Sequence, residues 1–364
     1  MKNTFGNALS VTIFGESHGA AIGAVIDGLT PGLTVDEDFI RHQLSLRRPA
    51  GRISTTRREA DEFQILSGVY EGRTTGSPLC IVIPNADTKS GDYQTEIARP
   101  GHADYTAECK YHGYQDARGG GHFSGRVTAA LVAAAALVLP ALKAKGIIIG
   151  THIARCAGVD DATLEADEAA LASQLASLND MPCAVLDESA EERMRGAIEA
   201  ARADGDSVGG VLETAIVGLP AGLGEPWFDS VESMLSHALF SIPAVKGVEF
   251  GDGFALADRK GSEANDAMAV RDGQVVTLTN HAGGIGGGIT SGMPVVFRCA
   301  IKPTPSIAKT QQTVDMKTGE SVAYAGRGRH DPCIVHRARV VVDSVAALVV
   351  ADLLTQRYGI EGWE

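Results

Sequence analysis

Short runs of β-branched and aliphatic residues, separated by glycine-rich turns, mark the N-terminal part of the chain. Residues 9–14 and 22–27 have the composition of two strands, and the turn between them contains the motif GESHG at 15–19. Further along, the pattern predicts a helix over about 35–46, with Thr34 as its cap, and a strand over 79–83.

The rest of the chain mixes helical and strand patterns. Residues 84–122 read mostly as loop, long enough to suggest a function. An Ala-rich run predicts a long helix over about 124–145, and the acidic segment 160–205 predicts two amphipathic helices, with Ser189 and Glu192 in a capping-box pattern. A last helix is expected over 343–358, capped by Asp343, and further strands at 146–154, 208–217, 245–250, 274–279 and 294–301.

Helices and strands that do not alternate strictly favour an α+β fold over a doubly wound parallel sheet. No low-complexity linker interrupts the chain, so we expect a single domain over residues 1–364. The segment GGGHFSGR at 119–126 is echoed by GGGITSGM at 286–293. The echo indicates either an internal duplication or a chance match between glycine-rich turns, and the pattern alone leaves both open.

Composition excludes several classes of function. The net charge is -13 and 44% of the residues are hydrophobic, which argues against nucleic acid or an anionic membrane as the main partner. The six cysteines are scattered without a C-x-x-C pair, and no H-x-x-x-H or H-E-x-x-H occurs, so no metal site is expected. Residues 127–142 are apolar but shorter than the ~20 residues of a membrane span. No secretion signal opens the chain, and we expect a cytoplasmic protein.

One segment is strongly positive although the protein as a whole is negatively charged. Residues 41–59 contain six arginines and no acid before Glu59. We expect Arg41, Arg57 and Arg58 to be solvated. The turn that follows Arg47 and Arg48 brings these two residues close to Arg52. Guanidinium groups bind phosphate and carboxylate oxygens in a bidentate manner, so this cluster predicts a site for a small polyanion. No aromatic residues alternate with the arginines as they would in a nucleic-acid site.

Three further segments carry candidate chemistry. Residues 117–126, ARGGGHFSGR, precede a predicted helix, where free amides attract anions, but they match neither a Walker loop nor a G-x-G-x-x-G fingerprint. From the sequence, these residues form either a phosphate-binding site or a turn with a purely structural role. The segment KPTPSI at 302–307 offers one cation and two hydroxyls. In GRHDPC at 328–333, Arg329 and Asp331 point to the same side of an extended chain, as a salt bridge or as a positioned base.

The motif GESHG also fits the G-x-S-x-G pattern of serine hydrolases. A nucleophile elbow needs a strand before the serine and a helix after it. The residues after Ser17 predict a second strand, so the pattern favours His18 as the functional residue. His102, also in a glycine-containing turn, is the other histidine expected to reach a ligand.

Eight motifs, in order along the chain, together resemble the chorismate synthase family. The resemblance runs from residue 1 to about residue 358. The motifs are GESHG (15–19), RRP (47–49), RPGHADY (99–105), DARGGG-x-x-SGR (116–126), AVKGVEFGDGF (244–254), NHAGGIGGGITSG (280–292), KPTPSI (302–307) and GRHDPC (328–333).

The resemblance implies a β-α-β sandwich with an internal duplication, assembled as a homotetramer. It implies that 5-enolpyruvylshikimate 3-phosphate is converted to chorismate by a 1,4-anti elimination of phosphate. It also implies a requirement for reduced FMN, with NADPH as a candidate reductant. The alternatives are a serine hydrolase built on Ser17 and a non-catalytic flavin-binding protein.

The resemblance also implies residue roles. His18 would act as an acid, His102 would stabilise charge near the flavin ring, and Asp331 would help to accept the ring proton. The substrate anions would bind Arg47, Arg48, Arg52 and Arg126. The flavin would contact His122, Phe123, Ser124, Ala244, Gly287, Lys302, Pro303, Thr304, Pro305, Ser306 and Arg329. Where the family commonly has R-S-S-A-R, this chain has HFSGR at 122–126, so we expect His122 and Phe123 to act through backbone amides.

Overall fold

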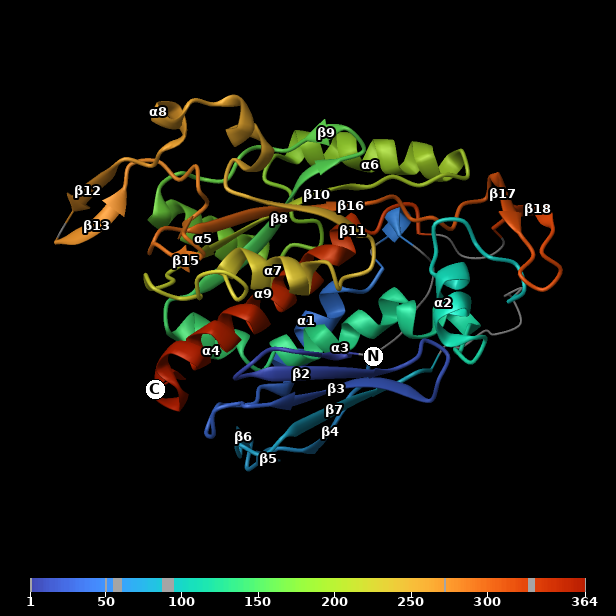
Figure 1. Ribbon diagram of the computed structural model, residues 1–364, viewed down its shortest axis with the longest axis horizontal. Coiled ribbons are helices and arrows are strands. Elements are labelled where there is room, and N and C mark those ends of the chain that lie inside the picture. Colours follow the sequence, from blue (N-terminus) through green and yellow to red (C-terminus); the bar gives the residue numbers. More distant parts are fainter. Residues whose placement is uncertain are drawn as a thin grey trace.

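The computed structural model describes residues 2–49, 51–54, 61–86, 95–271, 273–326 and 331–363. Two five-stranded antiparallel sheets form the outer parts of a sandwich (Figure 1). The first has the order β1 (Thr4–Phe5), β2 (Ser10–Gly15), β3 (Ala21–Asp27), β7 (Leu79–Pro84), β4 (Gln64–Ser67). The second has the order β11 (Val245–Phe250), β16 (Val295–Ile301), β10 (Gly210–Val217), β8 (Ile148–Cys156), β9 (Val159–Asp160).

A layer of helices separates the sheets (Figure 1). Helix α3 (Thr128–Ala135) packs on β3 and β7, α9 (Val335–Tyr358) packs on β8 and β10, and the two helices pack on each other. Because both are covered on all sides, their residues are apolar almost all round rather than along one stripe. The same layer contains α1 (Glu37–Leu46), α4 (Leu139–Ala144) and α7 (Val231–Leu239).

Two helices and several small elements complete the described chain. Helix α5 (Glu168–Leu178) covers the outer face of the second sheet, where Leu171, Leu175 and Leu178 form a second small core. Helix α6 (Glu188–Ala203) packs beside the edge strand β9, and its buried residues belong to the main core. The small elements are β5 (Val69–Tyr70), β6 (Arg73–Thr74), α2 (Asp104–Tyr111), α8 (Gly261–Ala264), β12 (Met268–Arg271), β13 (Gln274–Thr277), β14 (Ile285–Gly286), β15 (Ile289–Thr290), β17 (Thr310–Val314) and β18 (Ser321–Ala325). None of the described helices has the length and apolarity that a membrane-spanning helix requires.

The two halves of the chain repeat one topology, which confirms the expected α+β sandwich and its duplication. The elements that the halves share run β2-β3-α1-β4-β7-α3 in the first and β8-β10-α7-β11-β16-α9 in the second, with the other elements inserted between them. The strands take the same places in the two sheets, β2-β3-β7-β4 and β8-β10-β16-β11. The glycine echo is not part of this repeat. Residues 119–126 follow the last strand of their half, whereas 286–293 precede β16 and form the hairpin β14–β15.

Several helix boundaries differ from the predictions, each for a local reason. Helix α1 is capped by Asp36, whose carboxylate accepts a hydrogen bond from the Phe39 amide, and not by Thr34. Asp187, not Ser189, caps α6. The predicted helix 124–145 is divided into α3 and α4, and Pro140 lies in the first turn of α4, where its missing N–H has no cost.

The final helix is longer than predicted and begins at Val335. Asp343 therefore lies within the helix, and its carboxylate contacts the Thr151 hydroxyl at 2.5 Å and the Arg339 guanidinium at 3.0 Å. Burial raises the pKa of Asp343 to about 6, while Arg339 and Thr151 oppose that shift. The described part of the predicted loop 84–122 also contains the α-helix α2 and the start of a 3-10 helix at Arg118–Phe123.

A second buried carboxylate attaches the N-terminal segment to α9. The Asp352 carboxylate accepts hydrogen bonds from the backbone amides of Asn7, Ala8 and Leu9 at 3.0, 2.7 and 2.9 Å.

We expect Asp352→Asn to lower the free energy of unfolding by about 2–3 kcal/mol, because hydrogen bonds to a charged acceptor are lost in a buried place. Urea unfolding measures this. Asp38→Asn, at a side chain that is 95% exposed, should change it by less than about 0.5 kcal/mol; equal effects would contradict the argument.

Candidate functional site

A cavity of about 1520 Å³ lies where the two equivalent connections of the duplicated fold meet. One wall comes from the connection between β7 and α3, and the other from the connection between β16 and α9, with the ends of α1 and α7 completing it. Backbone hydrogen bonds join the two connections, from the Ala98 amide to the Val314 carbonyl and from the Met316 amide to the Glu96 carbonyl. This volume exceeds the usual range for a drug-sized ligand, so two small molecules can fit side by side.

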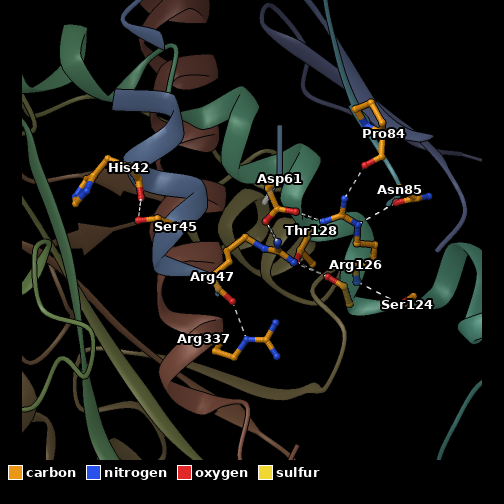
Figure 2. Close-up of polar contacts among 11 residues, drawn as sticks. His42, Ser45, Arg47, Asp61, Pro84, Asn85, Ser124, Arg126, Thr128 and Arg337 are labelled. Carbon is orange, nitrogen blue, oxygen red and sulfur yellow. Dashed lines mark hydrogen bonds and ion pairs between the residues drawn. The ribbon is translucent and has the colours of Figure 1, made fainter. Parts of the chain in front are cut away.

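Two buried arginines lie in the cavity wall on opposite sides of one carboxylate (Figure 2). Arg47, at the end of α1, donates to the Thr128 hydroxyl and to the Gly125 carbonyl at 3.1 Å each, and to Asp61 at 3.4 Å. Arg126, in the turn before α3, donates to Asn85 at 3.0 Å, to the Pro84 carbonyl at 3.3 Å and, at very short range, to the other oxygen of Asp61. The structure therefore brings together two of the four arginines predicted to bind substrate.

Of the other two, Arg48 lines the cavity, and the side chain of Arg52 lies outside the described part of the structure. Arg329 also lies outside the described residues. The assignments of Arg52 and Arg329 stay predictions.

Asp331 is held at the cavity wall by the first turn of α9. Its side chain is 9% exposed, and one carboxylate oxygen contacts Nη1 of Arg337 at 2.5 Å. The Nε of the same Arg337 donates to the Arg47 carbonyl at 2.7 Å (Figure 2). Arg337 thus connects the predicted base, Asp331, with the predicted anion-binding residue Arg47.

His18 lies behind the cavity wall. It is 8% exposed and is not among the lining residues, but Gly119, which does line the cavity, lies directly against its ring. A Cβ at Gly119 would lie 2.5 Å from Cδ2 and Nε2 of the imidazole, and Gly119 has a φ of +62°. Only glycine allows the ring to approach this closely.

We therefore expect Gly119→Ala to displace the His18 ring. The substitution should destabilise the fold by about 1–3 kcal/mol and reduce turnover, because of overpacking and a positive φ. Thermal unfolding and steady-state kinetics measure the two effects. Gly146→Ala is the matched control, since Gly146 also has a positive φ, +79°, but a Cβ there meets nothing within 4 Å; a Gly119 variant that behaves like it would contradict this account.

Ser17 does not have the setting of a hydrolase nucleophile. It is fully buried, its hydroxyl has no hydrogen-bond partner among the described residues, and its amide donates to the Gly121 carbonyl at 3.0 Å. The segment that follows is strand β3, not a helix. The geometry of a nucleophile elbow is therefore missing.

His102 lines the wall that the connection between β7 and α3 builds, and it is a neutral imidazole there. Its Nδ1 lies 3.3 Å from the Pro100 carbonyl, so Nδ1 is the donor there, and Nε2 accepts a hydrogen bond from the Ser306 hydroxyl at 2.9 Å. Burial, and then the charge of Arg99, lowers the pKa of His102 from 6.5 to about 4. The chain alone therefore presents His102 as a dipole and not as a cation at neutral pH.

This lowered pKa predicts a pH effect on stability. An unfolded histidine binds a proton near pH 6.5, whereas folded His102 does so only near pH 4. The stability due to neutral His102 is therefore present above pH 6.5 and is lost as the pH falls toward 4. Melting temperatures of His102→Asn should fall less steeply than those of the wild type over this range. His42→Gln, at a ring that is 44% exposed, should not flatten the curve; if it does so equally, burial is not the cause.

Most of the predicted flavin contacts line the cavity: His122, Phe123, Ser124, Ala244, Lys302, Thr304, Pro305 and Ser306. The side chain of His122 is bonded to the Gly15 carbonyl at 2.7 Å, and Lys302 donates to the Gly101 carbonyl at 2.6 Å. Pro303 is not among the lining residues. Gly287 is exposed in the turn of the β14–β15 hairpin, also outside the lining, so this chain by itself does not bring Gly287 to the cavity.

Sequence reasoning missed the carboxylate and guanidinium partners of the site. Asp61 follows the arginine-rich segment directly, and that position next to so many cations was the available signal. Arg337 and the pair Arg99–Asp104, which is joined at 2.7 Å, also line the cavity. In the described part of the chain, no group of three or more His, Cys, Asp or Glu residues is arranged to hold a metal ion.

Known proteins resemble this chain over almost its whole length. A family model described as chorismate synthase matches residues 9–355. A chorismate synthase of Aeropyrum pernix is 46% identical, covering 98% of this chain and 93% of its own length. One of Thermococcus kodakarensis is 46% identical, with coverage of 98% and 99%. A crystal structure of chorismate synthase superposes with a TM-score of 0.77 at 30% identity, covering 97% of this chain and 94% of that one.

Proposed function

Because the chain belongs to the chorismate synthase family of carbon–oxygen lyases, we propose that it converts 5-enolpyruvylshikimate 3-phosphate to chorismate by a 1,4-anti elimination that depends on reduced FMN. The observation that carries the proposal is that one cavity collects Arg126, His102 and Asp331 from three separate motifs. The substrate has one phosphate and two carboxylates, and a cationic wall in a protein of net charge -13 suits it.

The cavity suits a flavin together with this substrate. Its volume of about 1520 Å³ is enough for both. Its lining contains apolar side chains, such as Leu131, Val341 and Val345, as well as cationic ones. The residues that would hold the flavin are 122–124, Ala244, Lys302 and 304–306. The chemistry that bound reduced FMN supplies is electron density that helps the phosphate to leave.

The chain's own residues do the binding and the proton handling. Arg47 and Arg126 hold the substrate anions, and Arg48 and Arg52 extend that site. His18, behind Gly119, donates a proton on the phosphate side. Asp331, held by Arg337, accepts the ring hydrogen. His102 stabilises charge as a neutral hydrogen-bonding group, since its pKa of about 4 leaves it unprotonated at neutral pH.

The assembly we propose is a homotetramer. Large apolar side chains that do not line the cavity are exposed, among them Trp227 (85%), Phe228 (91%) and Phe254 (83%). The hairpin β12–β13 projects from the body of the molecule (Figure 1) and exposes Met268 (75%) and Val270 (72%). Exposed apolar surface of this kind is typical of an interface between subunits. Light scattering measures the assembly directly.

We place the protein in the cytoplasm, and the support is that all six cysteines are free thiols. NADPH is the proposed source of electrons for the flavin. To test this, NADPH replaces the chemical reductant in the assay below. Turnover without another reductase would support direct reduction of the flavin by this protein.

The test of the reaction is an anaerobic assay with purified protein, chemically reduced FMN and 5-enolpyruvylshikimate 3-phosphate. Phosphate release and chorismate absorbance are followed together, with oxidised FMN as control. We expect turnover only with reduced FMN. Flavin binding without turnover would support the alternative of a non-catalytic flavin-binding protein. Ester hydrolysis that is abolished by Ser17→Ala would support the serine hydrolase.

A further inference from the structure

Asp61 occupies the space between the two buried arginines of the cavity wall (Figure 2). Its side chain is 3% exposed, and those of Arg47 and Arg126 are 8% and 4% exposed. Each oxygen of the carboxylate contacts a different guanidinium, Oδ2 that of Arg47 and Oδ1 that of Arg126. A single carboxylate thus receives Nη1 of both side chains.

One carboxylate faces both guanidiniums in a place nearly free of solvent, where Coulomb interactions are stronger than in water. Without Asp61, two buried like charges would face each other. An incoming phosphate or carboxylate would meet the same two guanidiniums, but also the negative charge of Asp61.

The backbone at Asp61 also has an uncommon conformation. Its φ is +52°, in the left-handed region, which aspartate adopts more readily than most residues but seldom. The ion pairs to both arginines are the interactions that hold the carboxylate in this place.

We propose that Asp61 is an internal stand-in for a substrate oxyanion. It neutralises Arg47 and Arg126 in the free protein, and a phosphate or carboxylate group of the substrate competes with it for the same two guanidiniums. Asp61 thereby sets the affinity of the site for anions and limits the binding of ions that cannot displace it. This inference rests on the proposed function of the two arginines.

The experiment measures anion binding and does not need turnover. Melting temperatures of the wild type, Asp61→Asn, Asp116→Asn and Arg126→Gln are titrated with inorganic phosphate at constant ionic strength, and then with acetate to separate phosphate from carboxylate recognition. Asp116→Asn is the matched control, because Asp116 also lines the cavity and pairs with an arginine, Arg118, at 2.8 Å, but that arginine is 52% exposed.

We expect Asp61→Asn to melt at a lower temperature without anions and to bind phosphate about tenfold more tightly than the wild type. Asp116→Asn should change the phosphate affinity by less than about twofold. An Asp61→Asn variant that binds phosphate equally or more weakly overturns the proposal, since Asp61 would then only orient the arginines.

Arg126→Gln separates this proposal from the proposed function. If it leaves phosphate binding unchanged, the arginines are not the anion site and the proposed function loses that support. If it weakens binding while Asp61→Asn does not strengthen it, only the role of Asp61 fails. Should Asp61→Asn not fold in buffer, it is refolded with phosphate or with chloride at equal ionic strength. Recovery with phosphate alone supports the proposal, and recovery with neither or with both overturns it.

Discussion

Replacing Asp331 by asparagine is expected to lower kcat about 10²–10⁴-fold, the usual effect of losing a positioned acid or base. Asparagine keeps the size of the side chain but cannot accept the proton that the proposed reaction takes from the ring. Because the described ion pair of Asp331 is with Arg337, at 2.5 Å, and not with Arg47 or Arg126, KM should change by less than about threefold.

The measurement is steady-state phosphate release under anaerobic conditions with reduced FMN. Asp258→Asn, at an exposed position, is the control for the loss of one negative charge. An Asp331→Asn variant that keeps more than about a tenth of wild-type kcat would show that another group accepts the proton.

Arg337→Ala is expected to reduce kcat/KM about 10²-fold, because truncating the partner of a hydrogen-bonded charge that is itself buried, as Asp331 is, costs about 2–5 kcal/mol. The loss has two sources in the structure. The Asp331 carboxylate loses its partner at 2.5 Å, and the Arg47 carbonyl loses its donor at 2.7 Å. Arg337→Lys keeps the charge but not the two-sided geometry of the guanidinium, so only part of the activity should return.

A double-mutant cycle with Asp331→Asn tests the coupling. If Arg337 acts by positioning Asp331, the two substitutions together should cost little more than Asp331→Asn alone. Strictly additive losses in kcat would falsify this positioning role and leave Arg337 with a structural one. Unfolding in urea, measured in parallel, separates lost activity from lost stability.

The sequence pattern predicted the α+β class and most of its elements better than the limits of those elements, whereas the layered sandwich was expected only from the family resemblance. The strands around GESHG were evident from their β-branched residues, and the Ala-rich helix was evident from a long run of apolar residues rich in alanine. The start of α9 was placed too late because Asp343 looks like a helix cap, and only the tertiary fold shows that Thr151 and Arg339 surround it. The same limit explains Thr34, since Asp36 lies two residues closer to the helix and caps it.

The site was predictable where a motif carries its own chemistry and not where partners come from distant segments. Arg126 and His102 belong to motifs and line the cavity as expected. Asp61 has no motif of its own, and its importance arises only when the turn before α3 approaches the end of α1. Gly287 shows the reverse case, because its motif is clear but its place in this chain is remote from the cavity.

The duplicated topology has a consequence for how the walls of the cavity differ. Two identical half-length chains, paired as the halves are here, would build both walls from one sequence, so any residue on one wall would recur on the other. In a single chain the two connections vary independently: the one before α3 carries His102 and Arg126, and the one before α9 carries Lys302 and Asp331. Joining the halves therefore permits an asymmetric site, which can present different groups to the two faces of a ring.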